Sequence, residues 1–115
     1  MMYKYEPKSL KDSKLSGYVM LEALSYTEKL RYTDRCQFKF TSEGELDLES
    51  GRLESIAKMI EESEKYIKEV CIKSEDGKIE YKSYNDLQYG QDPVCGKILA
   101  EVASVILNGQ QLSGN

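Results

Sequence analysis

The fold is decided by residues 66–109, which read YIKEVCIKSEDGKIEYKSYNDLQYGQDPVCGKILAEVASVILNG. Near the start of this stretch, Val70-Cys71-Ile72 and the alternating run Ile79–Tyr81 flank the pair Asp76-Gly77. Glycine adopts positive φ at little cost, so an Asp-Gly pair between two such runs is typical of a tight hairpin turn. We therefore expect a β-hairpin near residues 68–82.

The second part of the stretch predicts helices. Ser83 is a suitable cap for a short helical turn that carries Leu87 and Tyr89. Asp92-Pro93 then begins the last helix, because Pro at the first helical position loses no hydrogen bond. Asn108-Gly109 ends this helix with residues suited to the left-handed conformation. Its expected apolar face consists of Cys95, Ile98, Leu99, Val102, Ala103 and Ile106.

The middle of the chain predicts two more helices. Ser25-Tyr26-Thr27-Glu28 matches a capping box, which predicts a helix over residues 26–35. Ser42-Glu43-Gly44-Glu45 matches a second capping box and begins an acidic helix over residues 43–64. From residue 53 onward apolar side chains recur at helical spacing, which predicts one buried face. That face consists of Leu53, Ile56, Ala57, Ile60, Ile67 and Val70.

These elements predict an α+β fold that is mostly α, with three to four helices and one β-hairpin in a single small domain. A chain of 115 residues fits one domain. We expect residues 1–16 to form a flexible polar leader, residues 17–109 the domain, and residues 110–115 a polar tail. The short apolar run Tyr18–Leu21 is compatible with a strand or with a helix start, because its period does not decide between them.

The charge distribution argues against nucleic acid as a partner. The formal net charge is −4, although residues 1–14 sum to +2 and residues 40–69 to −5. An acidic domain without a basic stripe binds nucleic acid poorly, since phosphate neutralisation supplies most of the non-specific affinity. No apolar run approaches the roughly 20 residues that span a bilayer, so we expect no membrane contact and a cytoplasmic location.

The residue types give no catalytic or metal-binding pattern. The chain has no histidine, which removes the commonest general base and metal ligand. Cys36, Cys71 and Cys95 lie far apart in the sequence, unlike the ligands of a zinc site. Asp86 and Asp92 bracket a glycine-containing loop that could hold a cation, but helix capping explains both residues more simply. We therefore expect no cofactor, no metal and no enzymatic activity.

Nine tyrosines, against two phenylalanines and no tryptophan, suggest protein contacts. Tyrosine combines an apolar ring with a polar tip, which suits interfaces as well as the edges of small cores. Tyr84, Leu87 and Tyr89 form the densest apolar cluster on a loop-like segment and are the candidate partner-binding residues. The alternative is that they fill the core between the hairpin and the last helix.

Much of the chain resembles the small tail assembly chaperones of long-tailed bacteriophages. The resemblance lies in the order of parts and covers about 90 residues. It implies a non-enzymatic protein that binds the tape-measure protein and recruits tail-tube subunits in the cytoplasm of the bacterial host, with self-association possible. The segments that carry it are Leu24–Leu30, Glu69–Lys73, Asp76-Gly77, Lys82–Leu87, Gln91-Asp92-Pro93 and Val102–Gly109.

A different class of function also fits the composition. A small acidic interaction module could present the helix over residues 43–64 to a partner, as an inhibitor or as a mimic of nucleic acid. Binding through such a face weakens steeply with salt, because exposed charges are screened. Charge reversal at Glu61, Glu62 and Glu64 would therefore separate this hypothesis from the chaperone.

Overall fold

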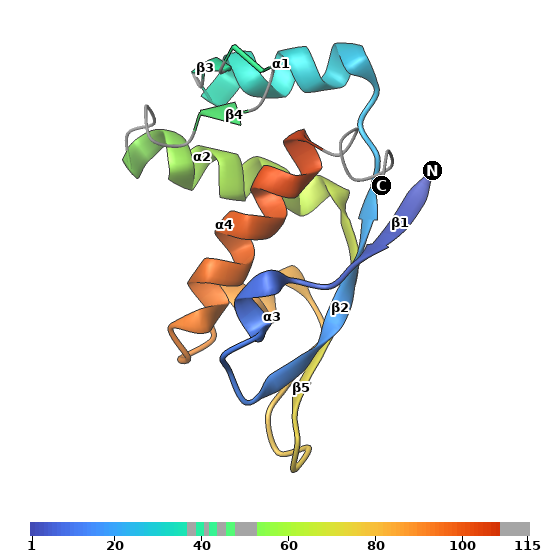
Figure 1. Cartoon of the computed structure of the whole chain (residues 1–115), viewed down its shortest axis with the longest axis vertical. Coiled ribbons are helices and arrows are strands. Elements are labelled where there is room, and N and C mark those ends of the chain that lie inside the picture. Colours follow the sequence, from blue (N-terminus) through green and yellow to red (C-terminus); the bar gives the residue numbers. More distant parts are fainter. Residues whose placement is uncertain (37–38, 41, 44–45, 48–52, 109–115) are drawn as a thin grey trace.

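The computed structural model describes residues 1–36, 39–40, 42–43, 46–47 and 53–108 (Figure 1). The strands are β1 (Met2–Tyr5), β2 (Leu15–Glu22), β3 (Lys39–Phe40), β4 (Leu46–Asp47), β5 (Ile67–Ser74) and β6 (Glu80–Tyr81). The α-helices are α1 (Tyr26–Cys36), α2 (Leu53–Ser63), α3 (Tyr84–Gln88) and α4 (Val94–Leu107). Two single 3-10 turns, η1 (Lys8–Leu10) and η3 (Glu64–Tyr66), complete the described elements.

Four of the strands form one antiparallel sheet in the order β1-β2-β5-β6. The central pair joins two eight-residue strands from distant parts of the chain, with Tyr18 opposite Cys71 and Gly17 opposite Ile72. On the far side of β5, Tyr81 of β6 also lies opposite Ile72, and Gly77 takes a φ of +74° in the turn between β5 and β6. The expected hairpin is therefore present as one half of the sheet.

The other half of the sheet overturns the predicted fold class. Residues 2–22, expected to be mostly a flexible leader, supply β1 and β2, so the expectation of a mostly helical fold with one hairpin is wrong. Tyr3 and Tyr5 alternate with the exposed Lys4, a period of two that suits a strand. That strand is stable only because β2 satisfies its backbone hydrogen bonds, and this partnership is not visible locally.

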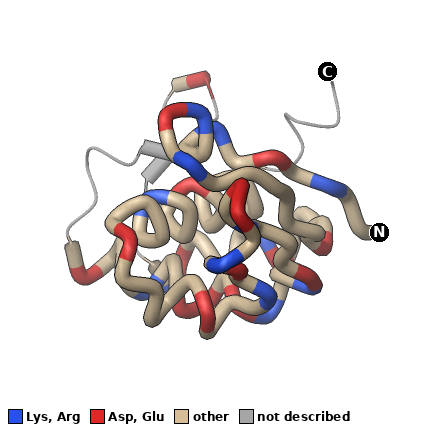
Figure 2. The backbone as a smooth tube through the Cα atoms, turned by 90° about the horizontal axis from the view of Figure 1, so that it is seen from below, with Lys and Arg blue, Asp and Glu red and all other residues tan. Residues whose placement is uncertain are grey.

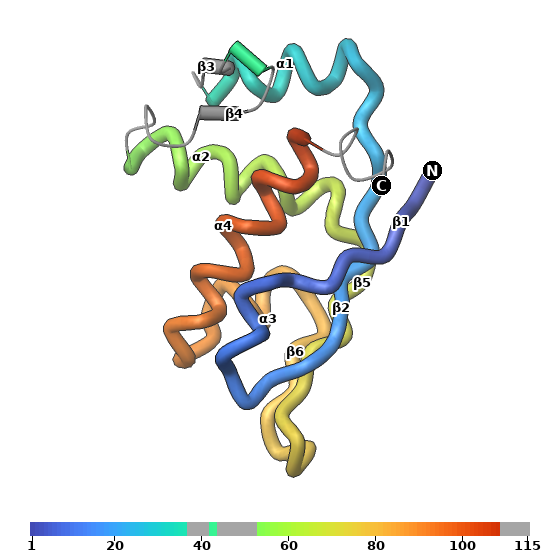
Figure 3. The backbone as a smooth tube through the Cα atoms, in the orientation of Figure 1, coloured from blue at the N-terminus to red at the C-terminus, as the bar shows by residue number. Residues whose placement is uncertain are grey.

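The core lies between one face of the sheet and the helices α2 and α4, which lie on the same side (Figure 3). Alternate residues of β2 are buried, and Val70 and Ile72 of β5 are buried beside them. All six residues of the apolar face expected for the last helix are buried, so this prediction is confirmed. Leu107, the last residue of the helix, is buried as well.

The helix α2 is shorter than predicted at both ends. The expected helix over residues 43–64 is wrong in its first part, because residues 46–47 form β4 and α2 begins at Leu53. It ends at Ser63, and Ile67 already begins β5, so the prediction that the helical face continues to Val70 is wrong. The buried face of α2 also differs from the predicted one. Leu53, which was predicted to be buried, is 86% exposed, whereas Met59, which was not in the predicted face, is completely buried. Isoleucine and valine in residues 67–72 are β-branched and favour strands, and pairing with β2 decides the outcome.

Helix capping follows the sequence closely. Ser25 and Glu28 form the expected reciprocal box, in which the Glu28 N–H donates to Ser25 Oγ at 3.1 Å and the Ser25 N–H donates to Glu28 Oε1 at 3.0 Å. The Asp86 N–H donates to Ser83 Oγ at 3.2 Å. The Val94 N–H donates to Asp92 Oδ1 at 3.0 Å, and the Lys82 N–H donates to Asp86 Oδ2 at 2.8 Å, so both carboxylates are used at the start of a helix. Parts of the second predicted capping box, residues 44–45, lie outside the described residues.

A single carboxylate ties the N-terminal segment to α4. Glu101 accepts hydrogen bonds from the Tyr5 hydroxyl, from the Lys8 N–H at 2.6 Å, and from the Ser9 N–H and hydroxyl at 2.9 and 2.5 Å. Burial acts to raise the pKa of Glu101, but these hydrogen bonds together outweigh it and hold the pKa below its ordinary value. The carboxylate therefore stabilises the fold in its charged form.

We expect Glu101→Gln to lower the free energy of unfolding at pH 7 by about 1–3 kcal/mol, because an amide cannot accept all of these hydrogen bonds. Since the pKa is lower in the folded state, the stabilisation is complete above the ordinary value of 4.5 and is lost as pH falls through the folded pKa. The difference in the free energy of unfolding between wild type and Glu101→Gln should therefore become smaller at acid pH. Urea denaturation at several pH values measures it, with Glu75→Gln in the exposed turn as control. A gap independent of pH would contradict the role of the charge.

Gly17 is the position in β2 where only glycine fits. Its φ is +144°, and an added Cβ would lie 1.8 Å from the Cys71 carbonyl oxygen. We expect Gly17→Ala to destabilise the protein by at least about 2 kcal/mol, from backbone strain and this clash. Gly96→Ala in α4 is the matched control, because its Cβ would meet no atom within 4 Å. Helix propensity predicts that Gly96→Ala raises the free energy of unfolding by up to about 1 kcal/mol. Thermal denaturation of both variants tests the contrast.

Candidate functional site

The three predicted partner-binding residues do not share one surface. Tyr84 and Leu87 are only 6% and 1% exposed and belong to the core, whereas Tyr89, at the end of α3, is 79% exposed. The alternative interpretation, in which this cluster fills the core, therefore describes two of the three residues. Tyr89 alone is available for direct contact.

The buried tyrosines have a structural use for their hydroxyl groups. The Tyr32 hydroxyl donates to the Met59 carbonyl oxygen, and the Tyr84 hydroxyl donates to the Ile60 carbonyl oxygen at 3.3 Å. Both carbonyls lie near the C-terminal end of α2, where helical partners run out. Burial of the Tyr32 ring raises the pKa of its hydroxyl, which stays protonated and donates. These rings thus pack and cap α2 rather than serve a partner.

The strongest candidate surface is the face of the sheet that points away from the helices (Figure 1). Within the described part of the chain, no helix covers it. We call it the outer sheet face, and its residues are Met2, Lys4, Ser16, Tyr18, Met20, Glu22, Lys68, Glu69, Cys71, Lys73 and Glu80.

The centre of the outer sheet face combines apolar and polarisable groups. Tyr18, Met20 and Cys71 are each half-buried. The Lys4 ammonium lies 4.6 Å from the centroid of the Tyr18 ring, a cation–π distance. Hydrogen bonding to Cys71, together with the nearby Glu69 charge, raises the pKa of the Tyr18 hydroxyl, so this group is neutral at physiological pH. The centre of the face is therefore an adaptable contact surface without a reactive charge.

All three cysteine thiols are free. Cys36 and Cys95 are buried, and burial raises the pKa of Cys36 to about 11. Cys71 is half-buried on the outer sheet face, where its thiol donates to Glu69 Oε1 at 3.1 Å. It is the thiol that reagents in solution can reach without unfolding the core.

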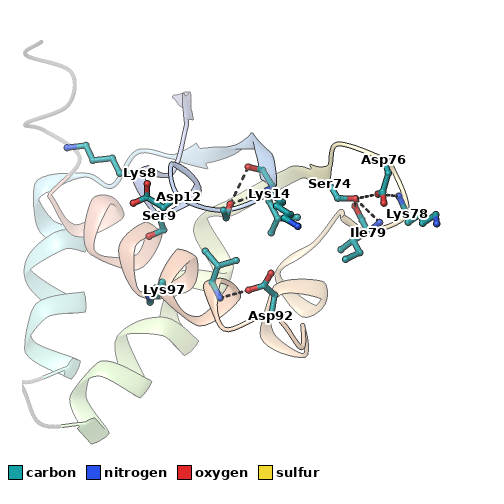
Figure 4. A pocket seen from close by; sticks show the side chains of 13 residues that line it. Lys8, Ser9, Asp12, Lys14, Ser74, Asp76, Lys78, Ile79, Asp92 and Lys97 are labelled. Carbon is teal, nitrogen blue, oxygen red and sulfur yellow. Dashed lines mark hydrogen bonds between the residues drawn. The ribbon is translucent and has the colours of Figure 1, made fainter.

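A second candidate is a depression of about 770 Å³ lined mainly by polar residues (Figure 4). It lies between η1 with the following loop, the turn between β5 and β6, and the start of α4. We call it the lysine groove. Its lining residues are Lys8, Ser9, Asp12, Ser13, Lys14, Leu15, Ser74, Asp76, Lys78, Ile79, Asp92, Val94 and Lys97.

Neither surface, as far as its described residues go, has a group of side chains placed to hold a metal ion. Among the described residues, no group of three or more His, Cys, Asp or Glu side chains is placed to hold a metal ion. Two of the aspartates in the lysine groove act as turn or helix caps. The described helices are also too short or too polar to cross a membrane.

Comparison with known proteins identifies no relative. No family model, curated protein or solved structure matches this chain.

The outer sheet face could have been predicted if residues 15–22 had been recognised as a strand. From residue 15 to residue 22, buried Leu15, Val19 and Leu21 alternate with Tyr18 and Met20. This is the pattern of a half-buried strand. Gly17 interrupts it, and the run Tyr18–Leu21 alone has no clear period. The lysine groove has no such signal, because it joins three distant segments.

Substitutions at α3 should separate its core residues from its surface residue. We expect Leu87→Ala to lower the free energy of unfolding by about 2–5 kcal/mol, because it leaves a cavity. Tyr89→Ala should change it by less than about 0.5 kcal/mol. Chemical denaturation of both variants measures this. Equal effects would mean that Tyr89 is packed in solution.

Proposed function

We propose that this chain is a non-enzymatic tail assembly chaperone of a long-tailed bacteriophage, which binds the helical tape-measure protein and recruits tail-tube subunits. The order of parts over residues 70–109 supports the family, and the outer sheet face supports the mode of binding. The observation that carries the proposal is that the outer sheet face has no helix packed on it among the described residues.

An uncovered sheet face favours a helical client. Small folds are built from layers, and a helix is a common partner for the apolar part of a sheet. Here α2 and α4 supply one helical layer, and a client helix would supply the other. Tyr18 and Met20 would contact it, and the unbranched methionine adapts to different client side chains. Adaptability matters for a chaperone that coats a long client of varied sequence.

The rim of the face supports specificity for a neutral or mixed-charge client. The Lys68 ammonium lies 3.0 Å from Glu22 Oε2, and the Lys82 ammonium lies 2.9 Å from Glu80 Oε1. The outer sheet face as a whole carries three lysines and three glutamates, so its net charge is close to zero; these are Lys4, Lys68, Lys73, Glu22, Glu69 and Glu80. Contact with the client would then depend mainly on apolar area, with weak sensitivity to salt.

Co-expression with the tape-measure and tail-tube proteins of the same genome tests the proposal. Wild type should co-purify with the tape-measure protein and keep it soluble. Met20→Asp should abolish this by placing a charge in the contact, and circular dichroism checks that this variant of a half-buried residue is folded. Leu53→Asp, at an apolar residue of α2 that is 86% exposed, is the matched control and should still bind. No complex with wild type would refute the chaperone.

Chemical modification gives a second readout on the same surface. A bulky maleimide should label Cys71 in the folded protein, since Cys36 and Cys95 are buried. Labelled protein should no longer bind the tape-measure protein, and Cys71→Ser treated identically should bind normally. If the label leaves binding unchanged, the client lies elsewhere.

The alternative is an acidic module that acts through residues 43–64. Of this segment, Glu61 of α2 and Glu64 of η3 are exposed to solvent, whereas Glu62 pairs with Arg35 at 3.2 Å and Lys65 at 3.3 Å. Reversal of Glu62 would therefore disturb the packing of α1 on α2. The pair of changes Glu61→Lys and Glu64→Lys is the cleaner test: a chaperone should keep its client, and an acidic mimic should lose its partner.

A further inference from the structure

The lysine groove carries four ammonium groups without a partner. Lys8, Lys14, Lys78 and Lys97 come from three segments of the chain, and none of these ammonium groups has an ion pair or hydrogen bond within the described residues. By contrast, each of Lys65, Lys68 and Lys82 pairs with a glutamate elsewhere on the surface. The four lysines of the lining stand against three aspartates, Asp12, Asp76 and Asp92, so the groove carries a small net positive charge of one.

Two of the carboxylates in the lining already accept hydrogen bonds from neighbouring backbone N–H groups. Asp76 accepts from the Ser74 hydroxyl at 2.6 Å and from the Lys78 N–H at 3.0 Å, and these bonds lower its pKa. Asp92 accepts from the Val94 N–H at the start of α4. Both side chains are committed to a turn or a helix end, and Asp12 is the remaining acid of the lining (Figure 4).

The N-terminal part of the lysine groove is basic, although the chain as a whole is acidic. The protein carries −4 in total, whereas residues 1–14, which provide Lys8 and Lys14, sum to +2. Seen from the end that holds the turn between β5 and β6, basic and acidic residues are interspersed (Figure 2). An extended polyphosphate would therefore meet Asp12, Asp76 and Asp92 as well as the lysines. A ligand with separated negative charges fits this pattern better.

The groove also offers apolar area beside the charges. Ile79 is 48% exposed, and Val94 is half-buried at the start of α4. Lysine presents a compact charge on a flexible stem, which suits carboxylates at variable positions better than it suits planar bidentate recognition. The lining therefore matches a peptide in which acidic side chains alternate with an occasional apolar one.

We propose that the lysine groove is a second docking site, which binds an acidic segment of a partner protein. Carboxylates of that segment would pair with Lys78 and Lys97, and an apolar side chain would rest on Ile79. The site is separate from the outer sheet face and does not rest on the proposed function. The two proposals can fail separately. Lys78→Glu and Lys97→Glu test the lysine groove, whereas Met20→Asp tests the binding of a client to the outer sheet face.

A fluorescein-labelled peptide of glutamates interspersed with leucine and glycine is the probe, measured by fluorescence anisotropy. We expect wild type to bind it, and Lys78→Glu and Lys97→Glu each to weaken binding by roughly tenfold. Lys58→Glu on α2 changes the net charge equally and should bind like wild type. Binding should also weaken as salt rises. A peptide with glutamine in place of glutamate should not bind.

Three results would overturn the proposal. The first is no binding of the glutamate peptide to wild type at low salt. The second is equal weakening by Lys58→Glu, which would show that net charge alone matters. The third is that an oligodeoxythymidylate binds with the same dependence on Lys78 and Lys97 while the peptide does not, which would make the groove a phosphate site. Thermal denaturation confirms that each lysine variant is folded.

Discussion

The antiparallel pairing of β2 with β5 is the constraint on which the rest of the structure depends. It joins residues 15–22 to residues 67–74, with α1 and α2 in the intervening chain, and each outer strand attaches to one member of this pair. Because side chains alternate across a strand, the register also decides which residues face the helices and which face outward. Val19, Val70 and Ile72 enter the core, and Tyr18 and Cys71 are left on the opposite side.

Polar anchors then fix the elements that the sheet alone does not hold. Glu101 of α4 collects four hydrogen bonds from residues 5–9, so a partly buried carboxylate connects the edge of the sheet to the last helix. The hydroxyls of Tyr32 and Tyr84 bond the carbonyls near the end of α2. Tyrosine is therefore frequent here partly for structural reasons: its ring fills the core while its hydroxyl satisfies a helix end.

A sheet with its described helices on one side has consequences for function. It leaves the outer sheet face available to a client and places the lysine groove at the boundary between the layers, where η1, the turn between β5 and β6 and the start of α4 converge. The first surface is nearly neutral with an apolar centre, and the second is polar with unpaired lysines. The two proposed docking surfaces therefore differ in their chemistry.

The sequence by itself determined the features that depend on neighbouring residues. Caps at Ser25, Ser83 and Asp92, the turn at Gly77 and the apolar face of α4 were all predictable, since each follows from short-range backbone chemistry or helical period. The tertiary structure alone decided that residues 2–22 join the sheet and that residues 67–70 are a strand rather than more of α2. The physical reason is that a strand is stabilised by a partner distant in sequence. For the same reason the candidate surfaces, which need register and convergence, were not predictable, and Tyr84 and Leu87 proved to be core.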